Sequence, residues 1–281
     1  MLESLRLICA RGHAPFQRGT AQRGGERMNA PVLLYGQRAP GTLVLAAEAL
    51  DVSTQEILLL PDVEVLYELF EMPMQVALAR LPVSLHPSVP AVLGVTVMHA
   101  KTSPFGAFTL AYVGIACRTG IKPRHFITGA FCGNDRAANY YCTRYGFAGQ
   151  SANVSYRETY DRTRGEVIVA GRPILDIAIT ECVPLVGVGG MIKYSPPLTG
   201  TRIDGKPAMV QFEAGYDFKH SVRGRPQLAQ FDATALGDAA LTPTMAIAGS
   251  RAVVDRHLMP ARFQVDMQTP AEQGGARKIA R

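Results

Sequence analysis

Beyond residue 62 the chain is a succession of short β-type runs divided by Gly, Pro and Asp turns, and this rhythm limits the folds open to it. Apolar residues alternate in VEVLYELFEM (63–72), and apolar runs follow at 91–100, 107–118 and 125–133. Neither a βαβ rhythm nor a repeat period is visible. We therefore expect a single α+β domain, mainly antiparallel and barrel-like, with a few short helices.

Two short helices are expected among these strands. PMQVALARLP (73–82) predicts one that Pro82 closes, and NDRAANYYCTRYG (134–146) predicts a second, capped by Asn134 or Asp135 and stopped by Gly146. Further on we expect strands at 152–161, 165–183, 189–198 and 208–218, a turn at 199–207, a strand and then a helix within 242–260, and a last strand at 261–267.

The two ends of the chain differ from its middle. Residues 1–30 are rich in Arg and Gly and predict a disordered tail, residues 31–267 form the predicted domain, and residues 268–281 predict a polar tail. The first segment also resembles a transit peptide in its composition. Met28 is as acceptable a start as Met1, because a more ordinary sequence follows it.

Charge and cysteine usage restrict the partners and the compartment. The net charge of +6 comes partly from the Arg-rich start, and no basic stripe interleaved with aromatic residues follows, so we expect no nucleic-acid partner. Uncharged apolar runs are too short for a membrane span. The five cysteines are odd in number and lack C-x-x-C spacing, which favours a reducing, cytoplasmic compartment.

No metal or organic cofactor is expected. His86, His99, His125, His220 and His257 show no close spacing of the kind that metal ligands need. The GVGG run at 187–190 is followed by the strand-like MIKY and not by a helix, so it does not predict a dinucleotide site.

An ordered set of segments is informative about the family. VTVMHAKTSPFGAFTL, AFCGNDRAANYYCTRYGFAGQSANV, GGMIKYSPPLTG and the C-terminal run from RPQLAQFD to MPARFQVDM come in that order over residues 62–267. Together they resemble the acetoacetate decarboxylase superfamily. The resemblance implies a double-layered, cone-shaped antiparallel β-barrel with an enclosed apolar cavity, in a protein that forms homo-oligomers.

The resemblance also exposes a missing nucleophile. Decarboxylases of this superfamily carry an aromatic-Pro-Lys-Lys run, whose first lysine forms a Schiff base with a β-keto acid. Matching aromatic to aromatic places Phe147-Ala148-Gly149-Gln150 on that run, so Gly149 stands at the nucleophile position. No lysine lies between Lys122 and Lys193. The family's acidic and basic partners fall in the same register at Leu110, Gly94 and near Val63.

The register suggests which residues remain near the site. His99 could be a general base or an ordinary rim histidine, and Lys101 could be a relocated Schiff-base lysine or a solvated cation. Arg144 could bind a carboxylate or serve the helix C-terminus. The predicted catalytic residues are His99, Lys101, Arg144, Tyr145 and Gln150, and the predicted substrate-binding residues are Tyr141, Phe147, Gly149, Phe105, Leu110 and Glu158.

Three functions stay open on the sequence alone. The first is an enzyme that acts on a small or polyketide-like keto or enol compound, as in secondary metabolism, by imine-free acid–base chemistry: hydration or dehydration, tautomerisation, cyclisation or hydrolysis. The second is a non-catalytic protein that binds a small molecule in the same cavity. The third is a Schiff-base lyase with a moved lysine, either Lys101 or Lys122.

Overall fold

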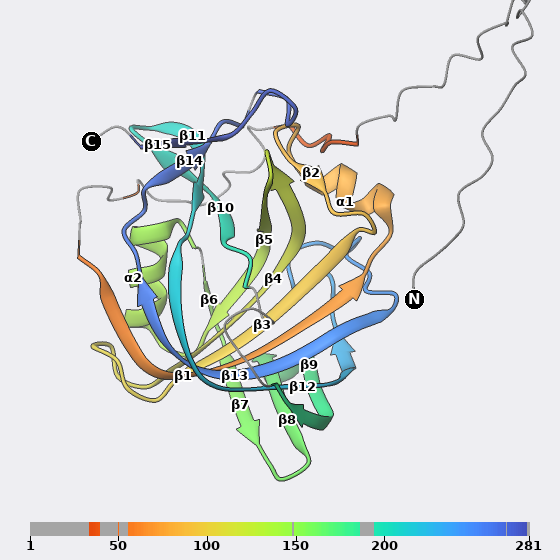
Figure 1. Cartoon of the computed structure of the whole chain (residues 1–281), viewed down its shortest axis with the longest axis vertical. Helices are drawn as coiled ribbons and strands as arrows, with labels where there is room; N and C mark the ends of the chain where they lie inside the picture. The colour runs from red at the N-terminus through yellow and green to blue at the C-terminus, as the bar shows by residue number, and fades with distance from the viewer. Residues whose placement is uncertain are drawn as a thin grey trace, which may run out of the picture. The chain divides into compact units, whose positions relative to one another are not determined.

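The computed structural model describes residues 34–39, 50, 56–147, 149–185, 194–267 and 269–279. The predicted tail at 1–30 lies outside them, as does 189–193 of one predicted strand. The described elements follow in the order β1 (Leu58–Glu71), α1 (Met74–Arg80), β2 (His86–Pro87), β3 (Val92–Ala100), β4 (Phe108–Thr119), β5 (Lys122–Cys132), α2 (Asp135–Tyr145), β6 (Gln150–Ser151), β7 (Asn153–Glu158), β8 (Arg162–Val169), β9 (Arg172–Pro184), β10 (Pro197–Ile203), β11 (Lys206–Gln211), β12 (Ala214–Phe231), β13 (Ala246–Leu258), β14 (Phe263–Val265) and β15 (Ala276–Lys278) (Figure 1).

The strands form one mainly antiparallel sheet, as predicted. Its order is β15-β14-β11-β10-β5-β4-β3-β1-β13-β12-β9-β8-β7, while β2 pairs with β4 and β6 pairs with β5. Only the β10–β5 and β5–β6 pairs are parallel. Within the described residues the path begins at β15 and ends at β7 without joining them, so strand pairing leaves the sheet open.

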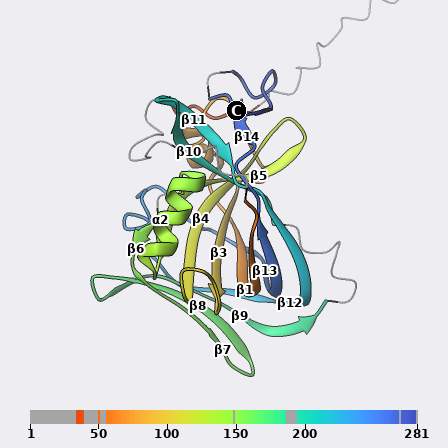
Figure 2. The ribbon, with the colours of Figure 1, turned by 90° about the vertical axis from the view of Figure 1, so that its left-hand side faces the viewer.

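The central strands are buried on both faces, which explains their apolar sequences. On the helix-side face, Val65 of β1, Met98 of β3 and Leu110 of β4 lie in one row and share a core with Tyr141 of α2. On the strand-side face, the next residues along these strands share a second core with β8 and β9. Figure 2 shows α2 on one side of the sheet and β7, β8 and β9 crossing below β1, β3 and β4.

Helix α2 has the local signals that the sequence predicts. The Asn134 side chain accepts a hydrogen bond from the backbone N–H of Ala137 at 3.0 Å, which makes Asn134 the N-cap. The helix ends at Gly146, which has a left-handed φ of 64°. The helix packs against β5 and β6 and so covers the helix-side face.

Several expectations for the second half of the chain are wrong. The strand predicted at 165–183 is a hairpin of β8 and β9, and the strand predicted at 208–218 is divided between β11 and β12. The predicted turn at 199–207 is a hairpin of β10 and β11, and only Asp204 and Gly205, with φ of 50° and 74°, form the turn. The predicted helix within 242–260 is absent, because β13 runs unbroken between β1 and β12 and pairs with both. The segment assigned to a polar tail contains β15, which pairs with β14.

Candidate functional site

A buried arginine stands at the centre of the helix-side core. Arg256 of β13 is 1% exposed, and its Nη1 donates a hydrogen bond to the Tyr141 hydroxyl at 3.3 Å. Its guanidinium carbon lies 5.0 Å from the centre of the Phe212 ring and 5.8 Å from that of Tyr216. Within the described residues, Nε and Nη2 have no hydrogen-bond partner. Because an unpaired buried donor is costly, this unpartnered edge has the chemistry to bind an anionic or carbonyl group.

The charge of Arg256 persists despite burial. Burial lowers the pKa of Arg256, but the neighbouring hydroxyls of Tyr216 and Tyr141 outweigh it, so the net pKa lies above the ordinary value. The guanidinium is therefore a fixed cation at neutral pH.

A chain of tyrosine rings leads away from the arginine. The Tyr194 ring lies 4.9 Å from the Tyr216 ring and 5.5 Å from the Tyr67 ring. Tyr67 of β1 and Tyr112 of β4 both face Thr96 of β3 across the sheet, so they belong to one row of the helix-side face.

Three tyrosines of this ring chain and sheet row, Tyr67, Tyr112 and Tyr194, are protonated donors. Burial, reinforced by Tyr216, raises the pKa of Tyr112 to about 12. Burial likewise raises the pKa of Tyr67 and Tyr194 well above the ordinary value. All three side chains are nevertheless only half-buried, and the Tyr194 hydroxyl has no partner among the described residues. Each of these rings is largely enclosed by protein and still keeps some exposed surface, so it is suited to contact a bound molecule.

A histidine stands at the far end of the ring chain. His125 of β5 is 6% exposed, and its Nε2 lies 3.4 Å from the Tyr67 hydroxyl. Burial lowers the pKa of His125 to about 4, and a hydrogen bond with the backbone of Ser195 only partly offsets it. The imidazole is neutral at pH 7, with one donor and one acceptor nitrogen. We call this set of residues the ring site: Arg256, Tyr216, Tyr194, Tyr67, Tyr112 and His125.

Four of the sequence-predicted residues gather at the ring site. Tyr141 binds Arg256, Tyr145 stacks on Phe212 at 4.0 Å, and Phe147 meets the Tyr112 ring edge-on at 5.4 Å. Leu110 is fully buried in the same core. The Tyr145 hydroxyl, however, donates to the backbone oxygen of Met259 at 2.8 Å, which gives it a structural partner.

The structure places three polar candidates on the other face. His99 follows Met98 and therefore points to the strand-side face, where its Nδ1 lies 2.9 Å from the Thr109 hydroxyl. The Lys101 side chain is 62% exposed and pairs with Glu64 at 2.9 Å. Glu158 of β7 is exposed and pairs with an arginine of β13.

The remaining candidates lie around α2. Arg144 is buried, donates to the backbone oxygen of Glu56 and stacks over the Tyr140 ring at 5.4 Å. Phe105 also packs on Tyr140, at 4.8 Å. Gln150 is exposed, and a Cβ at Gly149 would lie 3.6 Å from Cβ of Cys132. None of these four contacts Arg256 or His125 in the described structure.

Sequence reasoning missed Arg256, His125, Tyr67, Tyr112, Tyr194 and Tyr216. One available signal was the spacing in AVVDRHL. As a strand, it places Ala252, Val254, Arg256 and Leu258 on one face, so that an arginine interrupts an apolar row. The prediction of a helix there concealed this pattern.

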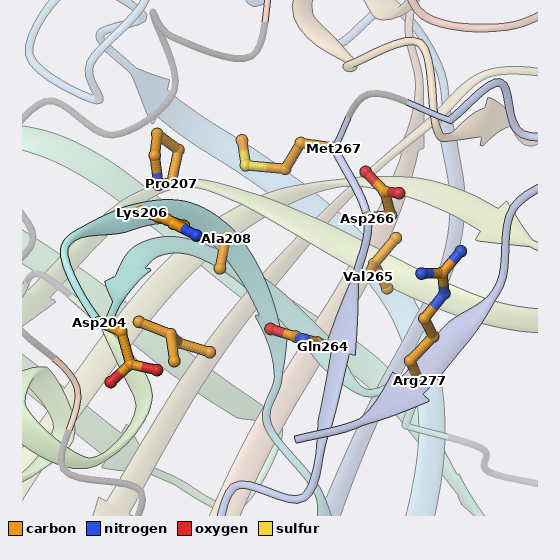
Figure 3. A pocket seen from close by; sticks show the side chains of 10 residues that line it. Asp204, Lys206, Pro207, Ala208, Gln264, Val265, Asp266, Met267 and Arg277 are labelled. Atoms are coloured by element: carbon orange, nitrogen blue, oxygen red, sulfur yellow. The ribbon is translucent and has the colours of Figure 1, made fainter. Parts of the chain in front are cut away.

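A separate pocket lies at the β10, β11, β14 and β15 end of the sheet. It has a volume of about 320 Å³, and Asp204, Lys206, Gln264, Asp266 and Arg277 are among the residues around it (Figure 3). It shares no residue with the ring site. In the described part of the chain, no three His, Cys, Asp or Glu side chains are placed to hold a metal ion. Neither described helix is long and apolar enough to cross a membrane.

Comparison with known proteins identifies the fold. No protein-family model and no curated protein sequence matches the chain. Among solved structures, acetoacetate decarboxylase from Legionella pneumophila aligns over 78% of this chain and 91% of its own, at 16% identity and a TM-score of 0.66. An acetoacetate decarboxylase-like enzyme from Sphingomonas wittichii RW1 aligns over 77% and 98%, at 10% identity and a TM-score of 0.57.

A third similar structure is an enduracididine biosynthesis enzyme, MppR. In complex with the condensation product of pyruvate and imidazole 4-carboxaldehyde it aligns over 82% of this chain and 96% of its own, at 14% identity and a TM-score of 0.60. The chain therefore has the acetoacetate decarboxylase-like fold, as the sequence resemblance implies.

Proposed function

We propose that the ring site binds a small or polyketide-like keto compound and promotes its enolisation without forming an imine. The observation that carries this proposal is the unpartnered edge of Arg256, a buried cation whose Nε and Nη2 lack partners in the described structure. Two parallel N–H groups of a guanidinium match a carboxylate, or a carbonyl that becomes an enolate. Tyrosine hydroxyls beside it add neutral donors for the developing charge.

The placement of the lysines supports imine-free chemistry. A Schiff base needs a neutral amine, which requires burial or a neighbouring cation. Each of the five described lysines is exposed, namely Lys101, Lys122, Lys206, Lys219 and Lys278. Lys193 lies outside the described residues. Lys101 in addition holds an ion pair with Glu64 at 2.9 Å.

The solved structures with a similar fold support a keto ligand but do not specify the reaction. MppR is described as a biosynthesis enzyme that binds a product of pyruvate condensation, so this fold can hold keto-acid chemistry other than decarboxylation. An enolate held by Arg256 would be the shared intermediate of dehydration, tautomerisation and cyclisation. The alternative, a non-catalytic binding protein, would use the same edge of Arg256 without proton transfer.

Acetoacetate and benzoylacetate in D2O can test the proposal by proton NMR. We expect both β-keto acids to bind and to exchange their methylene protons above the buffer rate, with no release of carbon dioxide. Borohydride added in parallel should leave the protein mass unchanged, and Lys101→Ala should behave like wild type. Reduction of a protein-bound imine would overturn the proposal and identify the lysine by peptide mass.

Variants at the guanidinium complete the test. Because a charge-assisted hydrogen bond contributes about 1.5–3 kcal/mol, Arg256→Gln should weaken binding by roughly 10- to 150-fold. If Arg256→Gln fails to fold, Tyr216→Phe takes its place in the binding test, because it keeps the ring beside Arg256 and loses only the hydroxyl. Arg262→Gln, on an exposed arginine paired with Glu213, is the matched control and should bind normally. Binding without any exchange would favour the non-catalytic alternative.

A further inference from the structure

Another cavity lies where the turn of the β4–β5 hairpin meets β11 and the β14–β15 pair. It has a volume of about 240 Å³, and its polar lining residues are Thr119, Lys122, Arg124 and Gln211. It shares no residue with the ring site or with the pocket of Figure 3. A ligand held in this cavity would therefore occupy a site of its own.

A second buried arginine, Arg124 of β5, lines this cavity. It is 2% exposed and has no carboxylate within ion-pair distance among the described residues. Its Nε donates to Oε1 of Gln211 at 2.7 Å, and its Nη1 donates to the backbone oxygens of Thr119 and Lys122, each at 3.0 Å. These acceptors are neutral, and Nη2 has no partner in the described part of the chain. A buried cation with only neutral partners is costly, so Arg124 has the chemistry to bind an anion.

The carboxylate that acts on Arg124 through space is already bound by other residues. Oε1 of Glu213 accepts from Nε2 of Gln211 at 2.8 Å, and its Oε2 accepts from Nη2 of Arg262 at 2.7 Å. Burial lowers the pKa of Arg124, and the effects of Cys117 and Glu213 offset it only partly. A carboxylate bound beside the guanidinium would supply the counter-charge that the described residues do not place in contact with it.

Two further donors line the same cavity. Thr119 is 3% exposed, and its Oγ1 is buried without a hydrogen-bond partner among the described residues. Lys122 pairs with Thr119 at the end of the hairpin, is exposed and carries a second positive charge. Because Nη1 of Arg124 bonds the backbone oxygens of both residues, the guanidinium lies between them at one end of the cavity. This end offers donors and positive charge, which suit an oxyanion.

The other walls favour an organic acid over an inorganic ion. Ile121 at the hairpin turn, Phe263 of β14 and Ala276 of β15 also line the cavity. Ile121 is 94% exposed, so an apolar tail packed against it would remove apolar surface from water. A hydrated phosphate ion would gain nothing from these walls.

We propose that this cavity is a second ligand site, which binds the carboxylate of a small organic acid with a short apolar tail. Arg124, Thr119 and Lys122 hold the carboxylate, and the tail packs against Ile121 and Phe263. The three hydrogen bonds of Arg124 fix its guanidinium before the ligand arrives, which lowers the entropic cost of binding. The inference is independent of the proposed function, because the two sites share no residue.

Isothermal titration calorimetry with butyrate tests the site, and butyramide is the uncharged analogue. We expect wild type to bind butyrate and not butyramide. Arg124→Gln should weaken butyrate binding roughly 10- to 150-fold, as the loss of a charge-assisted hydrogen bond does. Thr119→Val keeps the shape of the side chain and removes a hydroxyl without a protein partner. It should melt like wild type and bind butyrate roughly 2- to 10-fold more weakly.

A glycine of the cavity wall provides a variant that leaves Arg124 in place. A Cβ at Gly275 would meet no heavy atom within 4 Å, so Gly275→Leu has room to add bulk at the wall. It should abolish butyrate binding, and it replaces Arg124→Gln in the test if that variant fails to fold. Lys206→Gln, on an exposed lysine outside this cavity, is the matched control and should bind like wild type.

The outcomes decide both parts of the proposal. Butyrate affinity equal to that of wild type in folded Thr119→Val and Gly275→Leu would place the ligand elsewhere and overturn the site. No detectable binding of butyrate to wild type would overturn it as well. Inorganic phosphate that binds as tightly as butyrate would overturn the assignment to an organic acid.

Discussion

Glu68 is a carboxyl group enclosed in an apolar core, and its replacement should change how stability depends on pH. It lies in the middle of β1 on the strand-side face, opposite Val95 of β3 and Gly249 of β13, and is 0% exposed. Within the described residues neither of its carboxyl oxygens has a hydrogen-bond partner. Burial, reinforced by the charge of Asp176, raises the pKa of Glu68 to about 9 from the ordinary value of 4.5.

The sign of the effect follows from proton uptake. Between pH 4.5 and pH 9 the unfolded chain carries Glu68 ionised, whereas the folded protein holds it protonated. Folding therefore takes up a proton. The contribution of Glu68 to the free energy of unfolding is fully present below pH 4.5 and falls as the pH rises toward 9. Each pH unit removes about 1.4 kcal/mol, so about 4 kcal/mol is lost between pH 5 and pH 8. That is a large share of the 5–15 kcal/mol typical of a folded protein.

Glu68→Gln should abolish this dependence, because glutamine is neutral throughout. Urea unfolding at pH 5, 6, 7 and 8 gives the free energy of unfolding of both proteins. We expect the variant to gain on wild type by about 1.4 kcal/mol per pH unit. Val95→Ala disturbs the same core without removing a titratable group, so its difference from wild type should not vary with pH. A Glu68→Gln difference that is equally flat would refute a protonated Glu68.

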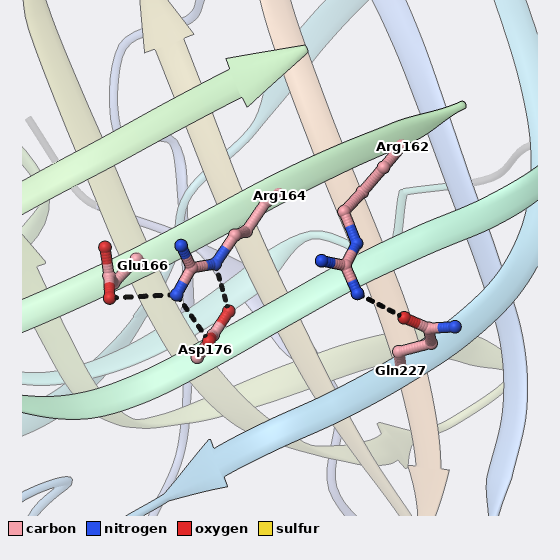
Figure 4. A network of polar contacts seen from close by, with 5 residues as sticks. All are labelled: Arg162, Arg164, Glu166, Asp176 and Gln227. Atoms are coloured by element: carbon pink, nitrogen blue, oxygen red, sulfur yellow. Dashed lines mark hydrogen bonds and ion pairs between the residues drawn. The ribbon is translucent and has the colours of Figure 1, made fainter. Parts of the chain in front are cut away.

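Three further changes test the packing and the polar contacts. Asn134→Ala removes the α2 cap and should lower the free energy of unfolding, measured in urea, by about 1 kcal/mol. Coinciding urea midpoints of the variant and wild type would show that the cap is redundant. Gly165→Ala places a Cβ 2.7 Å from Val97 and should cost about 1–3 kcal/mol. Val97→Ala should relieve most of that cost in a double-mutant cycle, and strict additivity would contradict the contact. Arg164→Met breaks the two bonds to Asp176, at 2.7 and 2.6 Å (Figure 4), but the pair is partly exposed. Its loss should cost no more than about 1 kcal/mol and shrink in high salt, and a larger, salt-independent loss would be inconsistent with this exposure.

The central strands were predictable because both of their faces are buried. The expected strands at 91–100 and 107–118 differ from β3 and β4 by one residue at the ends. Burial on both faces demands apolar runs, and such runs are visible without any alignment. Helix α2 was predictable for another local reason, since Asn134 and Gly146 supply its cap and its stop.

The C-terminal strands were not predictable from local pattern. β13 carries charged residues at Arg251, Asp255 and Arg256, which interrupt its apolar alternation. It is a strand because β1 and β12 pair with it along almost its whole length. β1 precedes β13 by nearly two hundred residues in the chain, so local sequence could not specify their pairing.

The family register selects residues of the helix-side core but misses the two buried polar residues described above, Arg256 and His125. The register selects Tyr141, Phe147 and Leu110, and the structure buries all three in one core. The register carries no information about a side chain that enters the space beside such a position from another strand. His125 lies 3.4 Å from the Tyr67 hydroxyl in space that a Cβ at position 94 would enter, and positions 94 and 125 lie on different strands. Gly94, where the family register expects an acid, leaves in the structure the space that the His125 imidazole fills.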